Sequence, residues 1–227
     1  ILRRTYPELE KSLILKSHEY YDLRISKYND GKHRWTTKTG KADSIIDFGY
    51  CKSDLDVFQY TGAEFTFLGI DQLEQWTELQ YKFLKSRLRS TIPGAWPRIR
   101  CSANPGGIGH AWVRRYFKIH DPSLWGKPWF PEPTAAEPEP LSRCYIPATV
   151  FDNFALMAAD PQYVARLQAL PEPQRSMYLY GNWDIFAGQA FQEWDSNIHT
   201  CDPFQIPKNW KLYIGVDFGY VAPFCAL

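Results

Sequence analysis

Two apolar segments of the chain end in polar side chains that could handle a phosphate. Phe67-Leu-Gly-Ile-Asp71 stops at a carboxylate, and Arg98-Ile-Arg-Cys-Ser102 runs into Ala103 and Asn104. Phosphate-handling α/β proteins place functional groups at the carboxyl ends of parallel strands. An aspartate there can hold hydrated Mg²⁺, and an amide there can sense a γ-phosphate. Both residues also have a structural alternative, since aspartate often caps helices and asparagine often forms turns.

A third apolar run, Lys211-Leu-Tyr-Ile-Gly-Val-Asp217, also ends in a carboxylate, and Gly219 follows it closely. Two-metal nucleases place their first metal ligand on a strand in this way, so Asp217 is a candidate ligand for Mg or Mn. An aspartate in a turn is the alternative. A two-metal site needs further carboxylates, which would have to come from later in the chain.

No stretch of the sequence supplies a cradle for a triphosphate, because the pattern G-x-x-x-x-G-K-[ST] does not occur in it.

Bulk composition adds few constraints. The hydrophobic share of 44% and net charge of +1 fit a folded domain and argue against disorder. A nearly neutral chain that binds DNA must do so through local basic patches. No run approaches the roughly 18 apolar residues that a membrane span needs.

A strand–helix–strand unit is expected to position the first two polar groups. The predicted elements are a strand over 64–71, a helix over 77–89 and a strand over 98–102, which together form a βαβ unit. Thr77 is a suitable N-cap, and an apolar helix face is predicted from Leu79, Phe83, Leu84 and Leu88. The near-continuous apolarity of the first strand predicts burial on both faces. The fold class is therefore α/β, with a parallel sheet flanked by helices.

The remaining elements are predicted from local patterns. A helix should begin near Pro7 and continue to about residue 21, and short strands joined by tight turns should occupy 22–48, including 45–48. Residues 121–140 contain six prolines, which indicates a surface loop or lid. Short helices are expected over 160–170 and 173–180. Residues 184–204 are irregular and could hold a domain junction.

In their order along the chain, several stretches resemble the large terminase subunits of tailed bacteriophages. The matching residues are 2–9 (LRRTYPEL), 59–65 leading into 67–71, 97–107 leading into 109–113, 180–184 (YGNWD) and 212–220 (LYIGVDFGY). The resemblance covers nearly the whole chain in one order. It implies a P-loop-type ATPase domain joined to an RNase H-like nuclease domain. The implied activity is ATP-driven movement of viral DNA into a procapsid, with cleavage of the DNA at start and finish.

The resemblance also implies roles for single residues. Asp71 resembles the Walker B aspartate that supports Mg with ATP. Ser102, Ala103 and Asn104 resemble the coupling motif that senses the state of ATP. Asp217 resembles the first metal-binding aspartate of the nuclease.

The same resemblance implies a domain organisation. Residues 1–185 would form an ATPase domain whose Walker A loop lies just upstream of Ile1. Within it, 120–140 would be the proline-rich loop and 141–185 a linker subdomain. Residues 186–227 would begin the nuclease domain.

One position departs from the family pattern. The family usually has glutamate directly after the Walker B aspartate, and this chain has Gln72. That glutamate activates the attacking water, and an amide cannot accept the proton, which predicts a loss of about 10²–10⁴ in rate. Glu74 is two residues further on. This offset is expected to move its side chain well away from the catalytic place, although a turn could bring it back.

The implied ligands and partners are Mg and ATP, a divalent metal for the nuclease, double-stranded viral DNA, the portal protein, the small terminase subunit and further copies in a ring. The expected location is the cytoplasm of the infected bacterial host. A non-catalytic remnant or assembly piece that binds portal or small subunit without hydrolysing ATP is the alternative. Some basic residues could contact DNA, or else form a solvated face. They are Lys82, Lys85, Arg87, Arg89, Arg114, Arg115 and Lys118.

Overall fold

The computed structural model describes residues 1–40, 42–135, 137–185, 201–202, 204–211, 216–217 and 225–226. Its contacts divide the chain into two compact units, Ile1–Gln189 and Ala190–Leu227. Within the described residues, no helix has the length and apolar character that crossing a membrane requires.

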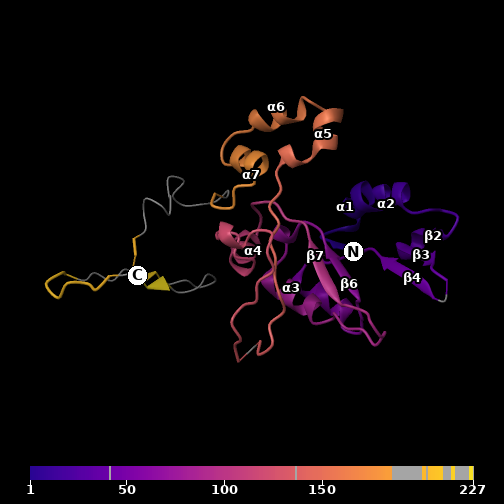
Figure 1. Ribbon diagram of the computed structural model, residues 1–227, viewed down its shortest axis with the longest axis horizontal. Helices are drawn as coiled ribbons and strands as arrows, with labels where there is room; N and C mark the ends of the chain where they lie inside the picture. Colours follow the sequence, from indigo (N-terminus) through magenta and orange to yellow (C-terminus); the bar gives the residue numbers. More distant parts are fainter. Residues whose placement is uncertain are drawn as a thin grey trace. The chain divides into compact units, whose positions relative to one another are not determined.

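The first unit is built around a four-stranded parallel sheet. Its strands are β1 (Leu2–Arg3), β5 (Gly49–Tyr50), β6 (Phe67–Ile70) and β7 (Arg98–Cys101), in the order β5-β1-β6-β7. Every neighbouring pair is parallel, so all four strands end at the same edge. Figure 1 shows β6 and β7 side by side. The predicted strands over 64–71 and 98–102 are confirmed as β6 and β7. The two-residue strands β1 and β5 were not predicted, because so short a segment has no apolar period.

Helices α3 (Glu78–Lys85) and α4 (His110–Tyr116) pack with this sheet. Their shared core contains large side chains that are at most 7% exposed. These are Leu68, Ile70, Trp76, Leu84 and Trp112. The predicted N-cap is confirmed, since the Thr77 side chain accepts from the backbone N–H of Gln80. The β6–α3–β7 order is the predicted βαβ unit.

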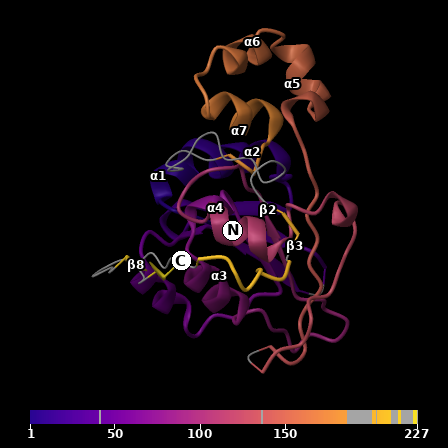
Figure 2. The ribbon, with the colours of Figure 1, turned by 90° about the vertical axis from the view of Figure 1, so that its left-hand side faces the viewer.

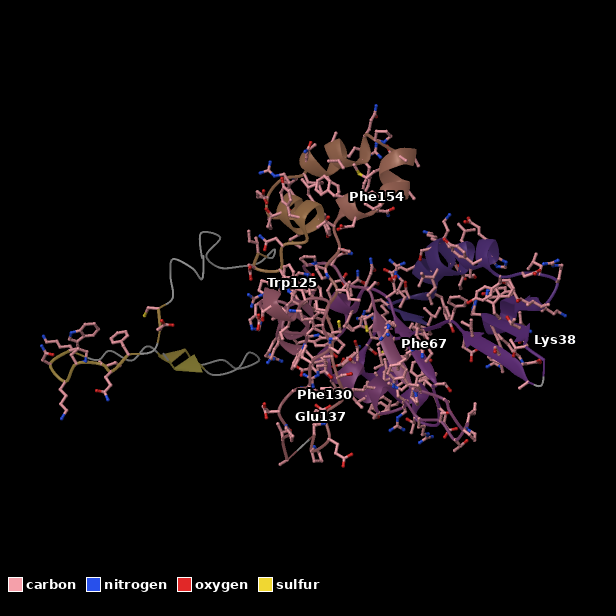
Figure 3. The ribbon with its side chains drawn as sticks, viewed as in Figure 1. Lys38, Phe67, Trp125, Phe130, Glu137 and Phe154 are labelled. Atoms are coloured by element: carbon pink, nitrogen blue, oxygen red, sulfur yellow. The ribbon has the colours of Figure 1, made fainter. Side chains whose placement is uncertain are left out.

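Two predictions about burial are wrong, one for strand β6 and one for helix α3. Phe67 on β6 is 46% exposed whereas its neighbour Leu68 is 1% exposed, so the described residues cover one face of the strand and leave Phe67 open (Figure 3). On α3, Leu79 is 55% exposed while Tyr81 and Leu84 are buried. The helix turns Tyr81 toward Trp112 of α4, at 5.3 Å between ring centroids, which leaves Leu79 on the surface.

A second, smaller core lies under a hairpin sheet. Strands β2 (Ser26–Asn29), β3 (Arg34–Lys38) and β4 (Asp43–Asp47) pair antiparallel in that order. This confirms the strands predicted over 22–48. A helical segment runs from α1 (Tyr6–Leu9) through a π-helical turn, η1 (Glu10–Ile14), to α2 (Leu15–Tyr20), as predicted from Pro7. Its apolar residues Leu9 and Ile14 pack against Trp35 and Phe48.

The proline-rich residues 121–140 contain a single short 3-10 turn, η5 (Pro122–Leu124), within the part that the structure describes. Further along lie η6 (Val150–Asp152), α5 (Phe154–Ala159), α6 (Tyr163–Gln168) and α7 (Gln174–Tyr180). The last three helices gather in one small group (Figures 1 and 2). The helices predicted over 160–170 and 173–180 are confirmed as α6 and α7, whereas α5 was missed.

In the second unit, β8 (Val216–Asp217) pairs antiparallel with β9 (Cys225–Ala226). Part of the strand predicted over 211–217 therefore forms, and residues 212–215 lie outside the described residues. The beginning of a nuclease domain over 186–227 stays a prediction.

Candidate functional site

The ends of β6 and β7 are joined by hydrogen bonds through Ser102. The Ser102 hydroxyl donates to a carboxylate oxygen of Asp71. The same hydroxyl oxygen accepts from the backbone N–H of Gln72 at 3.1 Å, and the Ser102 carbonyl accepts from the backbone N–H of Leu73 at 2.8 Å. Two predicted site residues, Asp71 and Ser102, are therefore in direct contact, and Gln72 is bound to them through its main chain.

Arg3, at the end of β1, brings a cation to the same place. Its Nη1 lies 3.4 Å from Oδ2 of Asp71, and the side chains are 15% and 24% exposed. Nη1 also donates to the Ser12 hydroxyl at 2.5 Å. The buried Nε atom of Arg3 has no hydrogen-bond partner among the residues that the structure describes. An anionic group at this edge would suit it, because guanidinium pairs strongly with phosphate oxygens.

Sequence reasoning gave Arg3 no role. The residue falls inside the resembling stretch 2–9, which was the available signal. Its distance from Asp71 along the chain hid the contact, because β1 and β6 become neighbours only in the folded sheet.

Gln72 turns the chain sharply after Asp71. Its backbone is left-handed, with φ 53° and ψ 59°, which is uncommon for a residue other than glycine. A one-turn 3-10 helix, η4 (Leu73–Gln75), follows directly. This turn directs the chain back toward the loop after β7, so that residue 74 stays close to the sheet edge.

Glu74 lies in this turn as a buried carboxylate, 5% exposed. Its Oε2 accepts from the backbone N–H of Asn104 at 3.1 Å. Burial raises the pKa of Glu74 to about 6, opposed by hydrogen bonds from the backbone of Asn104 and of Glu74 itself. Glu74 thus contacts a predicted site residue, contrary to the displacement that its offset from Asp71 predicts.

The loop after β7 packs so closely on Glu74 that two positions require glycine. A Cβ atom on Gly107, where φ is 72°, would lie 2.5 Å from the Glu74 carbonyl oxygen. One on Gly109 would lie 2.5 Å from the carbonyl oxygen of Trp76. The backbone N–H of Gly109 donates to the Glu74 carbonyl at 2.7 Å. Residues 102–109 are named the sensor loop after the role that the resemblance predicts for residues 102–104.

The other predicted site residues differ in their placement. Ala103 packs partly buried against the core, and Asn104 is exposed at the start of the sensor loop. Asp217 ends β8 in the second unit, where the structure describes its backbone and not its side chain. The structure therefore brings together the residues after β6 and β7 and leaves the role of Asp217 untested.

Most of the basic residues considered for DNA contact are already in ion pairs. Their partners are Glu78 for Lys82 and Arg115, Glu137 for Lys85, Glu64 for Arg89 and Asp184 for Arg114. Lys118 instead lies over the Trp129 ring, at 4.4 Å from its centroid. These contacts favour a structural use of the cations over a continuous phosphate-binding stripe.

The donors at this edge suit a magnesium–phosphate group better than a bare metal ion. Within the described residues, no three His, Cys, Asp or Glu side chains are grouped closely enough to hold a metal. Mg²⁺ at a nucleotide is usually held by one or two carboxylates together with waters and phosphates. The Asp71 carboxylate meets that requirement, the Ser102 hydroxyl adds a polar group beside it, and Arg3 could pair with a phosphate.

Neither a family model nor a curated protein matches the sequence. Solved structures of the large terminase from a thermophilic bacteriophage do match the fold. Crystal form 2 gives a TM-score of 0.58 at 17% identity, over 99% of this chain and 50% of that one. The ADP complex gives 0.53 at 18% identity, over 99% and 50%, and the ATP-gamma-S complex gives 0.50 at 17%, over 96% and 47%.

The fold is that of a parallel α/β domain with polar side chains at its strand ends, and it is similar to the fold of a phage large terminase. The likeness extends over almost every residue of the chain. The chain spans about half the length of the terminase that it matches.

Proposed function

We propose that this chain is a segment of the large terminase subunit of a tailed bacteriophage, which uses ATP to move double-stranded viral DNA into the procapsid and cleaves it. The observation that carries the proposal is the terminase fold over 99% of the chain. The contacts among Arg3, Asp71 and Ser102 at the strand ends add to it. The matching terminase has been solved with ADP and with ATP-gamma-S, which makes Mg-ATP the ligand to test first.

In this proposal each strand end has a separate task. Asp71 would hold a hydrated magnesium ion, which would supply charge neutralisation at the phosphates. Arg3 pairs with a phosphate oxygen. Ser102, Ala103 and Asn104 respond to the presence of the γ-phosphate, and a Walker A loop upstream of Ile1 cradles the remaining phosphates.

Gln72 separates nucleotide binding from hydrolysis. An amide can hold a water by hydrogen bonds, yet it cannot accept the proton that the water loses on attack. We expect Mg-ATP to bind and to be hydrolysed slowly. Glu74 has the right chemistry for a base, but its Oε2 is engaged by the Asn104 N–H, so we assign it to holding the sensor loop.

The second unit would supply the start of the nuclease. Asp217 would be the first ligand of a Mg or Mn site, and the remaining carboxylates would follow Leu227. The domain organisation proposed from the sequence, with ATPase residues to 185 and nuclease residues from 186, goes with this assignment. The portal protein, the small terminase subunit and further copies in a ring are the proposed partners, in the cytoplasm of an infected bacterium.

A non-catalytic assembly piece is the second candidate. One observation favours it: Gln72 stands where a catalytic glutamate is expected. Such a protein would bind portal or small subunit and would not bind Mg-ATP.

Calorimetric titration of Mg-ATP-gamma-S into the full-length protein separates the two candidates. The motor proposal predicts saturable binding with one site per chain, lost on removal of magnesium. Heat indistinguishable from dilution, in a sample whose folding is verified by circular dichroism, would leave the assembly piece as the better explanation.

A further inference from the structure

His110 connects the sensor loop to the segment that precedes the second unit. It is the first residue of α4 and is 4% exposed. Its Nδ1 accepts from the backbone N–H of Gly106 at 2.8 Å. Its Nε2 lies 3.0 Å from the carbonyl oxygen of Trp183.

The two contacts define the protonation of the ring. A backbone N–H can only donate, so Nδ1 must be the unprotonated acceptor. A carbonyl oxygen can only accept, so Nε2 must carry the proton. Burial lowers the pKa of His110, which keeps this neutral form. Each nitrogen thus has a separate task, one toward the loop and one toward residue 183.

Packing reinforces the connection on both sides. The His110 and Trp183 rings lie 5.1 Å apart between centroids. Gly106, with φ 110°, is so close to α7 that a Cβ atom would lie 2.5 Å from Cε of Met177. A change in the loop at Gly106 therefore meets both His110 and α7 directly.

Besides its contacts with His110, segment 181–185 is held by Trp183, which is buried in the main core, and by polar contacts. The backbone N–H of Asn182 donates to the Ser176 carbonyl at 3.2 Å, and the Asp184 carboxylate pairs with Arg114. Arg114 lies on α4, one turn after His110. Two residues of α4, His110 and Arg114, therefore hold this segment. Of the two, His110 also contacts the sensor loop, at Gly106.

The other end of the loop is fixed to β6 through Glu74, whose carboxylate holds Asn104. A continuous series of contacts thus runs from Glu74 through Asn104, Gly106 and His110 to Trp183. We propose that His110 is a positioning residue that transmits the arrangement of the sensor loop to segment 181–185, just ahead of the second unit. Its use as a signal of nucleotide state rests on the proposed function, whereas the mechanical connection does not.

Hydrogen–deuterium exchange tests the connection without any nucleotide. Glu74→Ala removes the anchor of Asn104 and perturbs the loop from its far end. In the otherwise unaltered chain, amides of 181–185 should exchange roughly tenfold faster, as expected when about one hydrogen bond of protection is lost. His110→Phe keeps a ring beside Trp183 but loses the hydrogen bonds to Gly106 and Trp183. In this background the amides of 181–185 should already exchange faster, and Glu74→Ala should add nothing.

Matched variants guard against general unfolding. His120→Ala changes an exposed histidine and should leave 181–185 unaltered. His110→Gln restores one acceptor and one donor, and should recover part of the coupling. Equal effects of Glu74→Ala on 181–185 with histidine or phenylalanine at 110, in folded samples, would overturn the proposal. If His110→Phe abolishes the effect of Glu74→Ala on 181–185 in a protein that does not bind ATP, the role of His110 is supported and the proposed function is contradicted.

Discussion

Two arginine–aspartate pairs illustrate how differently the two sheets of the first unit use similar residues. Arg3 and Asp71 meet at the ends of parallel strands, where their side chains are 15% and 24% exposed. Arg34 and Asp47 meet across the antiparallel hairpin sheet, with 37% and 49% exposure. In the first pair, Asp71 also accepts from the Ser102 hydroxyl and Arg3 also donates to the Ser12 hydroxyl. In the second pair, the two residues lie directly opposite each other on β3 and β4.

The buried polar groups differ in the same way. The core of the parallel sheet encloses the ionisable side chains Glu74 and His110. The hairpin core encloses Ser17, which accepts from Nε1 of Trp35 at 2.8 Å, and no buried acidic or basic side chain among the residues described there. Burying an ionisable group costs free energy unless it is well bonded. In the parallel sheet, the two buried ionisable groups, Glu74 and His110, lie after the strand ends, where we expect the functional site.

The largest expected effect is on catalysis at residue 72. Gln72→Glu should supply the missing base and raise ATP turnover of the full-length protein by about 10²–10⁴. Steady-state phosphate release measures it. Gln75→Glu makes the same chemical change at the end of the same turn and should have little effect. An unchanged rate with glutamate at 72 would contradict the role assigned to this position.

A large effect of another kind is expected in the hairpin core. Trp35 is fully buried, so Trp35→Ala should lower the free energy of unfolding by about 3–5 kcal/mol. Denaturant titration measures this loss. If the hairpin sheet has no part in the site, ATP affinity per folded molecule should stay constant. A matching loss of affinity at temperatures where the variant is folded would break the contrast between the two sheets.

A smaller effect should appear in the pH dependence of stability. The native pKa of Glu74 is raised from 4.5 to about 6, so the folded protein holds this proton more tightly than the unfolded chain. Glu74 therefore contributes stability that is complete below about pH 4.5 and is lost as the pH rises through about 6. The difference between the two pKa values corresponds to about 2 kcal/mol.

Glu74→Gln removes this titration. Relative to the wild type, its free energy of unfolding should increase by up to about 2 kcal/mol between pH 4.5 and pH 7, as the same linkage requires. Asp47→Asn in the hairpin sheet serves as the comparison. If the free energies of unfolding of Glu74→Gln and wild type differ by the same amount across this pH range, the raised pKa of Glu74 is contradicted.

The smallest expected effect concerns His110. Burial lowers its pKa, so its contribution to stability is present above the unfolded value of 6.5 and is lost as the pH falls through the folded value. Denaturant titration at several pH values should show a weaker pH dependence of unfolding below pH 6.5 in His110→Phe. The facing charged groups Asp184 and Arg114 act in opposite directions on this pKa. An unaltered pH profile in the folded variant would contradict the buried, neutral ring.

The sequence predicted those parts of the fold that have local signals. Apolar runs ending in Asp71 and Ser102 located β6 and β7, and Thr77 located the start of α3. Polar groups were predicted at the ends of two neighbouring strands, but the sequence did not predict which of them are in contact. Arg3 and His110 were missed as contacts, since each meets a partner that is distant along the chain and is brought near only by the fold.

Glu74 shows a different limit of sequence reasoning. Its place depends on the left-handed backbone at Gln72, and no rule of residue preference predicts that conformation for glutamine. The exposure of Leu79 and Phe67 was also unpredicted, because an apolar pattern identifies a face without identifying what covers it. The roles of all the predicted site residues stay predictions: Asp71, Gln72, Ser102, Ala103, Asn104 and Asp217.

Affinity for Mg-ATP-gamma-S in matched arginine and aspartate variants tests the central claim most directly. The measurement is equilibrium binding to the full-length protein, with Arg3→Ala and Asp71→Asn set against Arg34→Ala and Asp47→Asn. We predict that the strand-end variants weaken binding at least about tenfold, as expected for loss of one charge-assisted contact, while the hairpin variants bind like wild type. Equal affinity in all four variants, or no binding by the wild type, would contradict the assignment of the strand ends as a nucleotide site.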